Sequence, residues 1–326
     1  MDQRKGLLTS LLAVRVRPGP PFSSLLIIFI GNVNYFLDKL DRSRYIVIMN
    51  RLSIERRARI IGCLVEGNSL RATARMTDTA INTVVKLLVD VGKACSEYQD
   101  KALRNLTCKR LQCDEIWSFC YAKKKNVPED KKGQFGYGNV WTWTAICADS
   151  KLVPSWLVGD RSAETAVVFM EDLASRFSHR VQLTTDGWKA YLEAVDGAFG
   201  IDIDYAMLVK IYGDSVEPKS EKRYSPAKFT GSIKEVIMGN PDKKHISTSY
   251  AERQNLTMRM SMRRFTRLTN AFSKKVENLA HAVSLHFMYY NFARIHKTLR
   301  VSPAMEAGIS DHLWSLEEIA GLLDSK

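Results

Sequence analysis

The sequence predicts a mixed α/β domain preceded by a small all-α domain. Between residues 51 and 95, apolar residues recur every three or four positions, which is typical of short helices packed together. From residue 108 to 300, β-branched and aromatic runs alternate with helical stretches, which is typical of a mixed α/β domain. The chain has 326 residues, of which 45% are hydrophobic and 25% charged, so it suits a globular protein of about two domains.

Three helices are expected in the first domain. An apolar stripe from Ile54 to Leu64 predicts the first helix, which ends at Glu66-Gly67-Asn68. Ser69 can cap a short second helix, Leu70 to Arg75, and a longer third helix begins after Thr77-Asp78-Thr79. This order resembles a helix-turn-helix, although a plain three-helix bundle with a solvated basic face has the same pattern. The arginines that would contact DNA phosphates are Arg56, Arg57, Arg59, Arg71 and Arg75.

The larger domain begins with three strands, a helix, a strand and a second helix. This order matches a ribonuclease-H-like core, so we expect a mixed five-stranded sheet with flanking helices. A fifth strand, a long basic insertion and two more helices follow. Strands are expected at 111–121, 139–148, 151–158, 181–185 and 205–212, and helices at 163–177, 188–195, 250–266 and 274–293.

Changes in composition suggest four segments. Residues 1–48 combine a Leu-rich patch with three prolines, and Met49 directly precedes the helical pattern, so we expect a leader that is disordered or not translated. We then expect a helix-turn-helix domain at 49–98, the α/β core at 108–305 with an insertion at 200–247, and a C-terminal helical tail at 306–326.

Charge and cysteine usage favour a nucleic-acid partner in a reducing compartment. The net charge is 48 − 35 = +13, which favours a polyanion, with nucleic acid ahead of a membrane surface. The most apolar stretch, Leu25 to Ile30, is too short to span a bilayer. The six cysteines form no C-x-x-C pair and no histidine lies at finger spacing, so no zinc site is expected.

The strand from Leu111 to Tyr121 contains two adjacent acids, Asp114 and Glu115. An ionised carboxylate inside a strand is costly unless it is paired or binds a metal ion. Since side chains alternate along a strand, only one of the two acids is expected in a site. We choose Asp114, which shares its face with Gln112 and Ile116. An acid facing water from an edge strand, or one paired with an arginine, would have the same sequence.

Two later segments offer further acids. Asp186 ends a predicted strand, and sites collect at the carboxyl ends of strands in α/β sheets, although Asp-Gly is also a common turn. Glu252 begins a helix, where Ser249-x-x-Glu252 would also fit a capping box. Acids from a strand, a strand end and a helix could together form one Mg²⁺ site.

The helix that starts near Glu252 is rich in arginine. Arg259 lies two turns after Glu252 on nearly the same face, where it could hold a phosphate. Such an excess of like charges repels itself without an anionic partner, although a solvated face is the simpler interpretation. The predicted DNA-binding residues here are Arg253, Arg259, Arg263, Arg264 and Arg267.

Four motifs carry a family resemblance. They are Cys113-Asp-Glu-Ile-Trp117, Thr185-Asp-Gly-Trp188, Glu252-Arg-Gln-Asn-Leu256, and the tail from Arg294 to Pro303. Together they resemble bacterial insertion-sequence transposases with an Asp-Asp-Glu triad, closest to the "insertion sequence one" type. Two features differ from the familiar member: 65 residues (187–251) separate the second Asp from the Glu, and an N-terminal Cys-type zinc element is not found.

The resemblance implies that Asp114, Asp186 and Glu252 form the catalytic, metal-binding triad. We expect two Mg²⁺ ions, replaceable by Mn²⁺, about 3.5–4 Å apart and bridged by Asp114. Water would cut the DNA strand at the element end, and the freed 3′-OH would then attack target DNA. The expected partners are double-stranded DNA and further copies of the chain, as a homodimer or larger assembly, and the expected location is the bacterial cytoplasm, at the nucleoid.

Two other functions fit the same residues. One is a non-catalytic DNA-binding protein derived from a transposase. The other is a different ribonuclease-H-like nuclease, such as a junction resolvase or an RNA-strand hydrolase, which would hydrolyse its substrate without strand transfer.

Overall fold

A computed structural model describes residues 51–213, 229–266 and 270–324 of the chain. The predicted leader at 1–48 and the predicted DNA-binding residue Arg267 lie outside this part.

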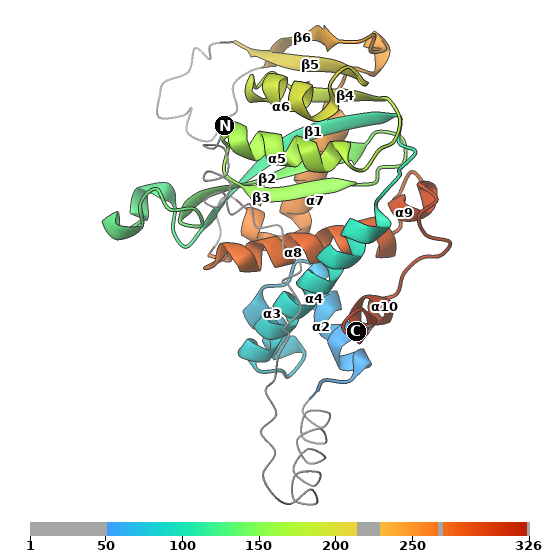
Figure 1. Cartoon of the computed structure of the whole chain (residues 1–326). Coiled ribbons are helices and arrows are strands. Elements are labelled where there is room, and N and C mark those ends of the chain that lie inside the picture. Colours follow the sequence, from blue (N-terminus) through green and yellow to red (C-terminus); the bar gives the residue numbers. More distant parts are fainter. Residues whose placement is uncertain (1–50, 214–228, 267–269, 325–326) are drawn as a thin grey trace, which may run out of the picture.

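A six-stranded mixed sheet forms the centre of the molecule, in the order β3-β2-β1-β4-β5-β6 (Figure 1). Strands β1, β2 and β3 pair antiparallel in succession, whereas β4 is parallel to β1 and β5 is parallel to β4. The mixed α/β prediction is confirmed, and this strand order is consistent with a ribonuclease-H-like core. The strands are β1 Arg110–Cys120, β2 Gly138–Cys147, β3 Ser155–Gly159, β4 Val181–Asp186, β5 Ile203–Tyr212 and β6 Phe229–Met238.

The sheet has six strands, so the prediction of five was wrong. β6 lies within the predicted insertion at 200–247 and pairs antiparallel with β5, from Tyr205 opposite Met238 to Tyr212 opposite Phe229. Most of its side chains are exposed, so it lacks the alternation of apolar and polar residues that reveals a strand with one buried face. As an edge strand it is held mainly by backbone hydrogen bonds to β5.

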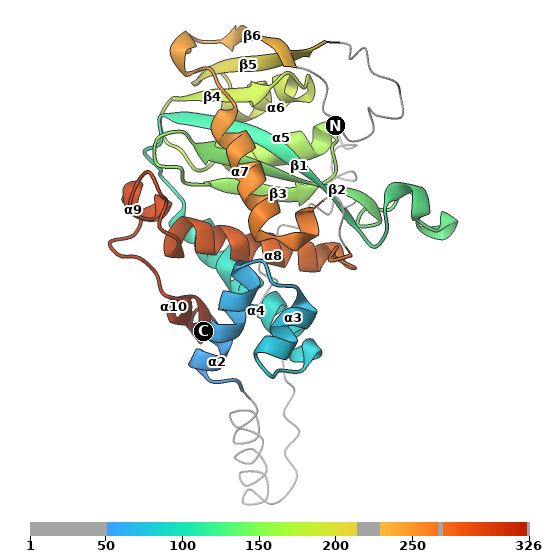
Figure 2. The same ribbon diagram turned by 180° about the vertical axis from the view of Figure 1, so that it is seen from behind.

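Helices cover both faces of the sheet. Helices α5 and α6 lie on one face, and α7 lies on the opposite face (Figures 1 and 2). Under α5 and α6 the fully buried Trp143 of β2 packs against the rings of Phe169, Trp188 and Tyr191. The bounds are α5 Ala163–Ala174, α6 Ala190–Phe199 and α7 Ser249–Ser261.

In the part of the chain that the structure describes, three helices precede the sheet, close to the predicted positions. Ser53 and Ser69 cap the first two, because their hydroxyls accept hydrogen bonds from the backbone N–H groups of Arg56 and Ala72. The third helix, α4, packs along α8, as Figure 1 shows. These helices are α2 Ile54–Val65, α3 Leu70–Met76, α4 Ile81–Ala102 and α8 Val276–Met288.

The C-terminal part returns to the first helices. Helix α8 continues as one π-helical turn, Tyr289–Ala293, and is followed by α9 (Pro303–Glu306) and α10 (Leu316–Gly321). Helix α10 packs against α2, beside an ion pair between Arg57 and Asp324. Among the described helices, none combines the length and the apolar character needed to cross a membrane.

Candidate active site

The separation of two parallel strands positions the acids. Strands β1 and β4 pair only from Arg110 opposite Gln182 to Gln112 opposite Thr184. Beyond that point β1 continues along β2, and β4 ends at Asp186. Asp114 and Asp186 each lie two residues past the last pair, so they face the same gap between the strands.

Three carboxyl groups meet at this gap. Asp114, Glu115 and Asp186 each offer an oxygen atom, and these three atoms lie within 4.8 Å of one another. The expectation that Glu115 points away from the site was therefore wrong. Asp114 and Glu115 do contact different layers, α7 and α6 respectively. Asp186, however, lies at a strand end beside β1, where it can be approached from both faces of the sheet.

Asp114 is held between its own strand and α7. Its Oδ2 accepts a hydrogen bond from Asn255 Nδ2 at 2.8 Å, and its Oδ1 accepts one from the backbone N–H of Glu115 at 2.9 Å. Burial, followed by the negative charges of Asp186 and then Glu252, raises the pKa of Asp114 to about 6. Ionised Asp114 is therefore disfavoured, first by its burial and then by the neighbouring negative charges.

Glu115 lies on the α6 side of the strand, where its side chain is only 1% exposed. It accepts a short hydrogen bond from the Tyr191 hydroxyl, and Arg161 Nη2 lies 3.3 Å from its Oε2. Burial, together with the charge of Asp186, raises the pKa of Glu115 to about 7. It can therefore gain or lose a proton near neutral pH.

Glu252 lies beside this group and outside the set of three close oxygens. Its Oε1 accepts a hydrogen bond from the Thr248 hydroxyl at 2.5 Å and pairs with the Lys210 ammonium group. The capping box that its sequence allowed is not formed, because Thr248 is the N-cap and the Ser249 N–H donates to Ser247. Glu252 therefore does not cap α7. Its negative charge contributes to the raised pKa of Asp114.

Arg161 is a site residue that sequence reasoning missed. It follows β3 and lies between the rings of Trp141 and Trp188, 5.0 and 4.9 Å from their centroids. From there its Nη2 lies 3.7 Å from Asp186 Oδ2, in addition to its pairing with Glu115. Lys210 of β5 was also missed. Neither residue lies in a recognisable motif, and only the fold brings them to the acids.

The predicted DNA-binding arginines fall into three groups. Arg57 does not present its charge to solvent, because its side chain is buried and donates to both oxygens of Asp324. Arg259 and Arg264 are partly buried, and both donate to backbone carbonyls. The exposed ones are Arg56, Arg59, Arg71, Arg75, Arg253 and Arg263.

The acidic group fits a divalent cation. Carboxylate oxygens are the ligands that Mg²⁺ and Ca²⁺ prefer in proteins, and three are available within 4.8 Å. The raised pKa values of Asp114 and Glu115 indicate negative charge that a bound cation would neutralise.

The comparisons with known proteins give little beyond this geometry. No protein-family model matches the chain, and no curated protein matches it. Among solved structures, the chain is similar to a piggyBac transposase in a synaptic complex with hairpin DNA. The similarity has 10% sequence identity and a TM-score of 0.38, and it covers 82% of this chain and 68% of that one. A similarity this slight carries no argument, so the function is inferred from the residues.

Proposed function

We propose that the protein is a DNA transposase of the Asp-Asp-Glu type, similar to those of bacterial insertion sequences of the "insertion sequence one" group. The observation that carries the proposal is the acidic group in the gap between β1 and β4. Asp114 and Asp186 each lie two residues past the last β1–β4 pair. The charge of Glu252, on α7, raises the pKa of Asp114. The sequence motifs around these three acids support the same interpretation.

In this proposal Asp114, Asp186 and Glu252 would hold Mg²⁺. When bound, Mg²⁺ activates the attacking oxygen and stabilises the leaving oxygen of a phosphodiester. Asn255 and the Glu115 N–H fix the orientation of the Asp114 carboxylate, and the Trp188 N–H, 3.0 Å from Oδ1, fixes that of Asp186. Arg161 places a positive charge beside the gap, suited to a scissile phosphate.

Double-stranded DNA is the proposed partner. The net charge of +13 would attract it, and the exposed Arg56 of α2, Arg75 of α3 and Arg253 of α7 would contact its phosphates, so binding should weaken steeply with salt. Helices α2 to α4 are proposed as the helix-turn-helix that recognises the element ends. Joining two ends requires at least two copies of the chain, which we propose assemble on DNA in the bacterial cytoplasm.

The proposal is tested with the full chain and a DNA fragment carrying the gene's own flanking ends. We expect Mg²⁺- or Mn²⁺-dependent end cleavage followed by joined products, and we expect both to disappear in Asp186→Asn. Cleavage without joining would favour a hydrolytic nuclease of the same fold. Tight, salt-sensitive binding without any cleavage would favour the non-catalytic DNA-binding protein.

A further inference from the structure

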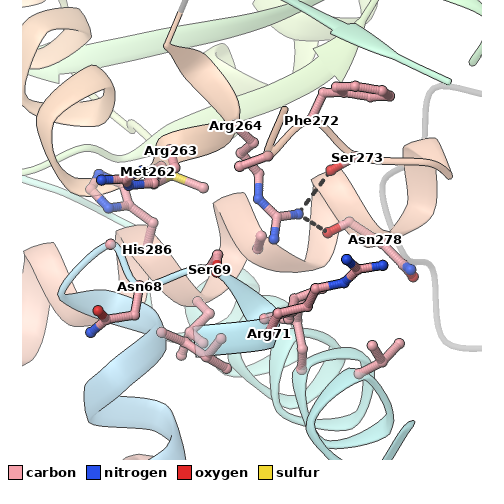
Figure 3. A pocket seen from close by; sticks show the side chains of 18 of the residues that line it. Asn68, Ser69, Arg71, Met262, Arg263, Arg264, Phe272, Ser273, Asn278 and His286 are labelled. Carbon is pink, nitrogen blue, oxygen red and sulfur yellow. Dashed lines mark hydrogen bonds between the residues drawn. The ribbon is translucent and has the colours of Figure 1, made fainter. Parts of the chain in front are cut away.

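A second site lies between the first helices and the segment that follows α7. It is a cavity of about 860 Å³, lined on one side by residues of α2, α3, α4 and the turn between α2 and α3, and on the other by residues within 262–264 and 270–286 (Figure 3). Its volume is in the range of pockets that bind small ligands, or a short piece of a larger one. The acids of the candidate active site do not line it.

The charged residues that line this cavity are all basic. Arg71 of α3, the adjacent pair Arg263 and Arg264, and Lys274 line it, whereas none of the lining residues is an aspartate or a glutamate. Within the described part of the chain, the side chains of Arg71 and Arg263 make no ion pair and are exposed. Four cationic groups without a counter-charge repel one another, so the arrangement favours an anionic ligand.

Arg264 is held in position for such a ligand. Its Nη1 donates to Ser273 Oγ at 2.8 Å and to the Asn278 carbonyl at 3.0 Å, as Figure 3 shows. Burial lowers the pKa of its guanidinium to about 10, which leaves it charged at neutral pH. A guanidinium has five N–H donors, and two hydrogen bonds through one nitrogen leave donors for a phosphate.

An independent observation comes from His286 of α8, which also lines the cavity. Its side chain is buried, and neither ring nitrogen has a hydrogen-bond partner among the described residues. Buried polar groups are nearly always hydrogen-bonded. Both ring nitrogens are shielded from solvent, so a ligand in the cavity could pair with them only after the imidazole turns toward it.

The rest of the lining combines polar side chains with an apolar wall and the ring of Phe272; the polar residues are Asn68, Ser69, Asn270, Ser273, Asn278 and His286. Ile81, Val85 and Leu88 of α4 form part of the wall, and Phe272 lies beside Lys274, whose Nζ is 4.3 Å from the ring centroid. A ligand with both phosphates and flat apolar faces would match these two kinds of surface. Unpaired nucleotides have this composition, whereas a duplex keeps its base faces stacked inside.

We propose that this cavity binds a short unpaired stretch of DNA strand, with phosphates at Arg71, Arg263, Arg264 and Lys274 and bases against Phe272 and the apolar wall. The proposal rests on the proposed function in taking DNA as the ligand. It adds a single-strand site formed jointly by α3 and the segment after α7, separate from the acidic gap.

The test measures equilibrium binding of the full chain to a fluorescein-labelled oligothymidine of about ten nucleotides, a length within the usual site sizes for single strands. EDTA is present, so catalysis plays no part. A plot of log K against log salt has a negative slope. For each of Arg71→Gln and Arg263→Gln we expect the magnitude of this slope to decrease by about 0.7. Phe272→Ala should weaken single-strand binding at least about fivefold through lost stacking.

Lys101→Gln is the matched control, because it removes the same charge from an exposed position on α4 outside the cavity. It should leave the binding slope unchanged. Arg71 and Arg263 are exposed, so their variants should fold, and thermal melting confirms this for each protein.

Unchanged single-strand binding in all three cavity variants would overturn the proposal. So would a loss confined to duplex binding, which would assign the cavity to a duplex backbone. The proposed catalytic function fails separately: Asp186→Asn that still cuts DNA would refute the triad and leave the single-strand result standing.

Discussion

Glu115 combines almost complete burial with a pKa of about 7, raised from 4.5 by desolvation and by the charge of Asp186. Between pH 4.5 and about pH 7, residue 115 binds more protons in the folded chain than in the unfolded chain. The free energy of unfolding therefore decreases as the pH rises from about 4.5 to about 7, and stays reduced above that. The shift corresponds to roughly 3 kcal/mol for this residue, and Asp114, raised from 3.8 to about 6, adds a contribution of the same sign.

We expect Glu115→Gln to stabilise the metal-free protein at about pH 8 and to have a much smaller effect near pH 5, because glutamine carries no charge to desolvate. The measurement is the melting temperature in EDTA across this range. Glu193→Gln, at an exposed position on α6, is the control and should leave the pH dependence unchanged. A Glu115→Gln protein that follows the wild-type curve would show that the buried carboxylate carries no such cost.

Arg57 illustrates a charge that stabilises the fold instead of binding DNA. Its buried guanidinium donates to the Ala320 carbonyl and to both oxygens of Asp324, which joins α2 to the C-terminal segment. We expect Arg57→Gln to lower the free energy of unfolding by about 1–3 kcal/mol, the usual effect of losing hydrogen bonds to a charged group. Because Asp324 is 40% exposed, the lower end of this range is expected.

The same variant should leave the salt dependence of DNA binding unchanged. Arg59→Gln, at an exposed position of the same helix, provides the comparison: it should leave the melting temperature nearly unaltered. If Arg57→Gln lowered the salt slope by about 0.9, as expected for a lost contact to duplex phosphate, the structural role assigned to Arg57 would be wrong.

At the scale of whole elements, the contact between α4 and α8 joins the first helices to the core. It depends on Gly92, because a Cβ there would lie 2.6 Å from both the Cβ and the carbonyl oxygen of His281. The Ser284 hydroxyl also donates to the Gly92 carbonyl at 2.7 Å. The two backbones therefore approach closely, and no side chain can be inserted without separating them.

We expect Gly92→Ala to destabilise the protein by about 1–3 kcal/mol or more, since the clash involves backbone atoms that cannot move independently. Gly197→Ala is a matched control on α6, where a Cβ would meet nothing within 4 Å. That change should be neutral or stabilise by up to about 1 kcal/mol through helix propensity. Thermal and chemical denaturation of both variants measures the difference, and equal melting temperatures would contradict the close approach.

The elements differ in how well the sequence could predict them. Strands β1, β2 and β4 are buried and rich in β-branched or aromatic residues, so their positions could be predicted within a few residues. β6 could not, because an exposed edge strand needs no apolar face. The end of α7 was placed too late, at 266 instead of Ser261, since the arginine-rich segment beyond it continues as a short 3-10 turn without a clear stop signal.

The candidate site shows the same division. Their strand positions made Asp114 and Asp186 candidates, and the family resemblance selected them; the structure brings them together. Glu115, Arg161 and Lys210 could not, because their proximity depends on where β1 and β4 separate and on which strands lie beside them. Side-chain alternation predicted the two faces of β1 correctly, but it gave no information about an acid at a strand end that both faces can reach.

Across the whole molecule, the acidic gap lies between the α6 layer and the α7 layer, so a bound cation would connect both layers to the sheet. We expect Ca²⁺ or Mg²⁺ to raise the melting temperature at about pH 8, where the carboxylates of Asp114 and Glu115 are ionised. The increase corresponds to about 2.7 kcal/mol when the cation is at 100 times its Kd. Near pH 5 the increase should be much smaller, because the pKa values of about 6 and 7 leave both groups largely protonated. Asp114→Asn should abolish the effect at either pH.

Lys210 allows the third ligand to be identified. Its ammonium group pairs with Oε1 of Glu252, so its positive charge opposes a cation that binds this carboxylate. If Glu252 is a ligand, Lys210→Met should tighten cation binding and raise the melting temperature further at saturating Ca²⁺, and Glu252→Gln should weaken binding. If Glu115 completes the site with Asp114 and Asp186 instead, neither variant should change the cation affinity much, and Glu115→Gln should reduce it. Calorimetric titration of the three variants with Ca²⁺ at about pH 8, where Asp114 and Glu115 are ionised, separates these two arrangements without requiring DNA or turnover.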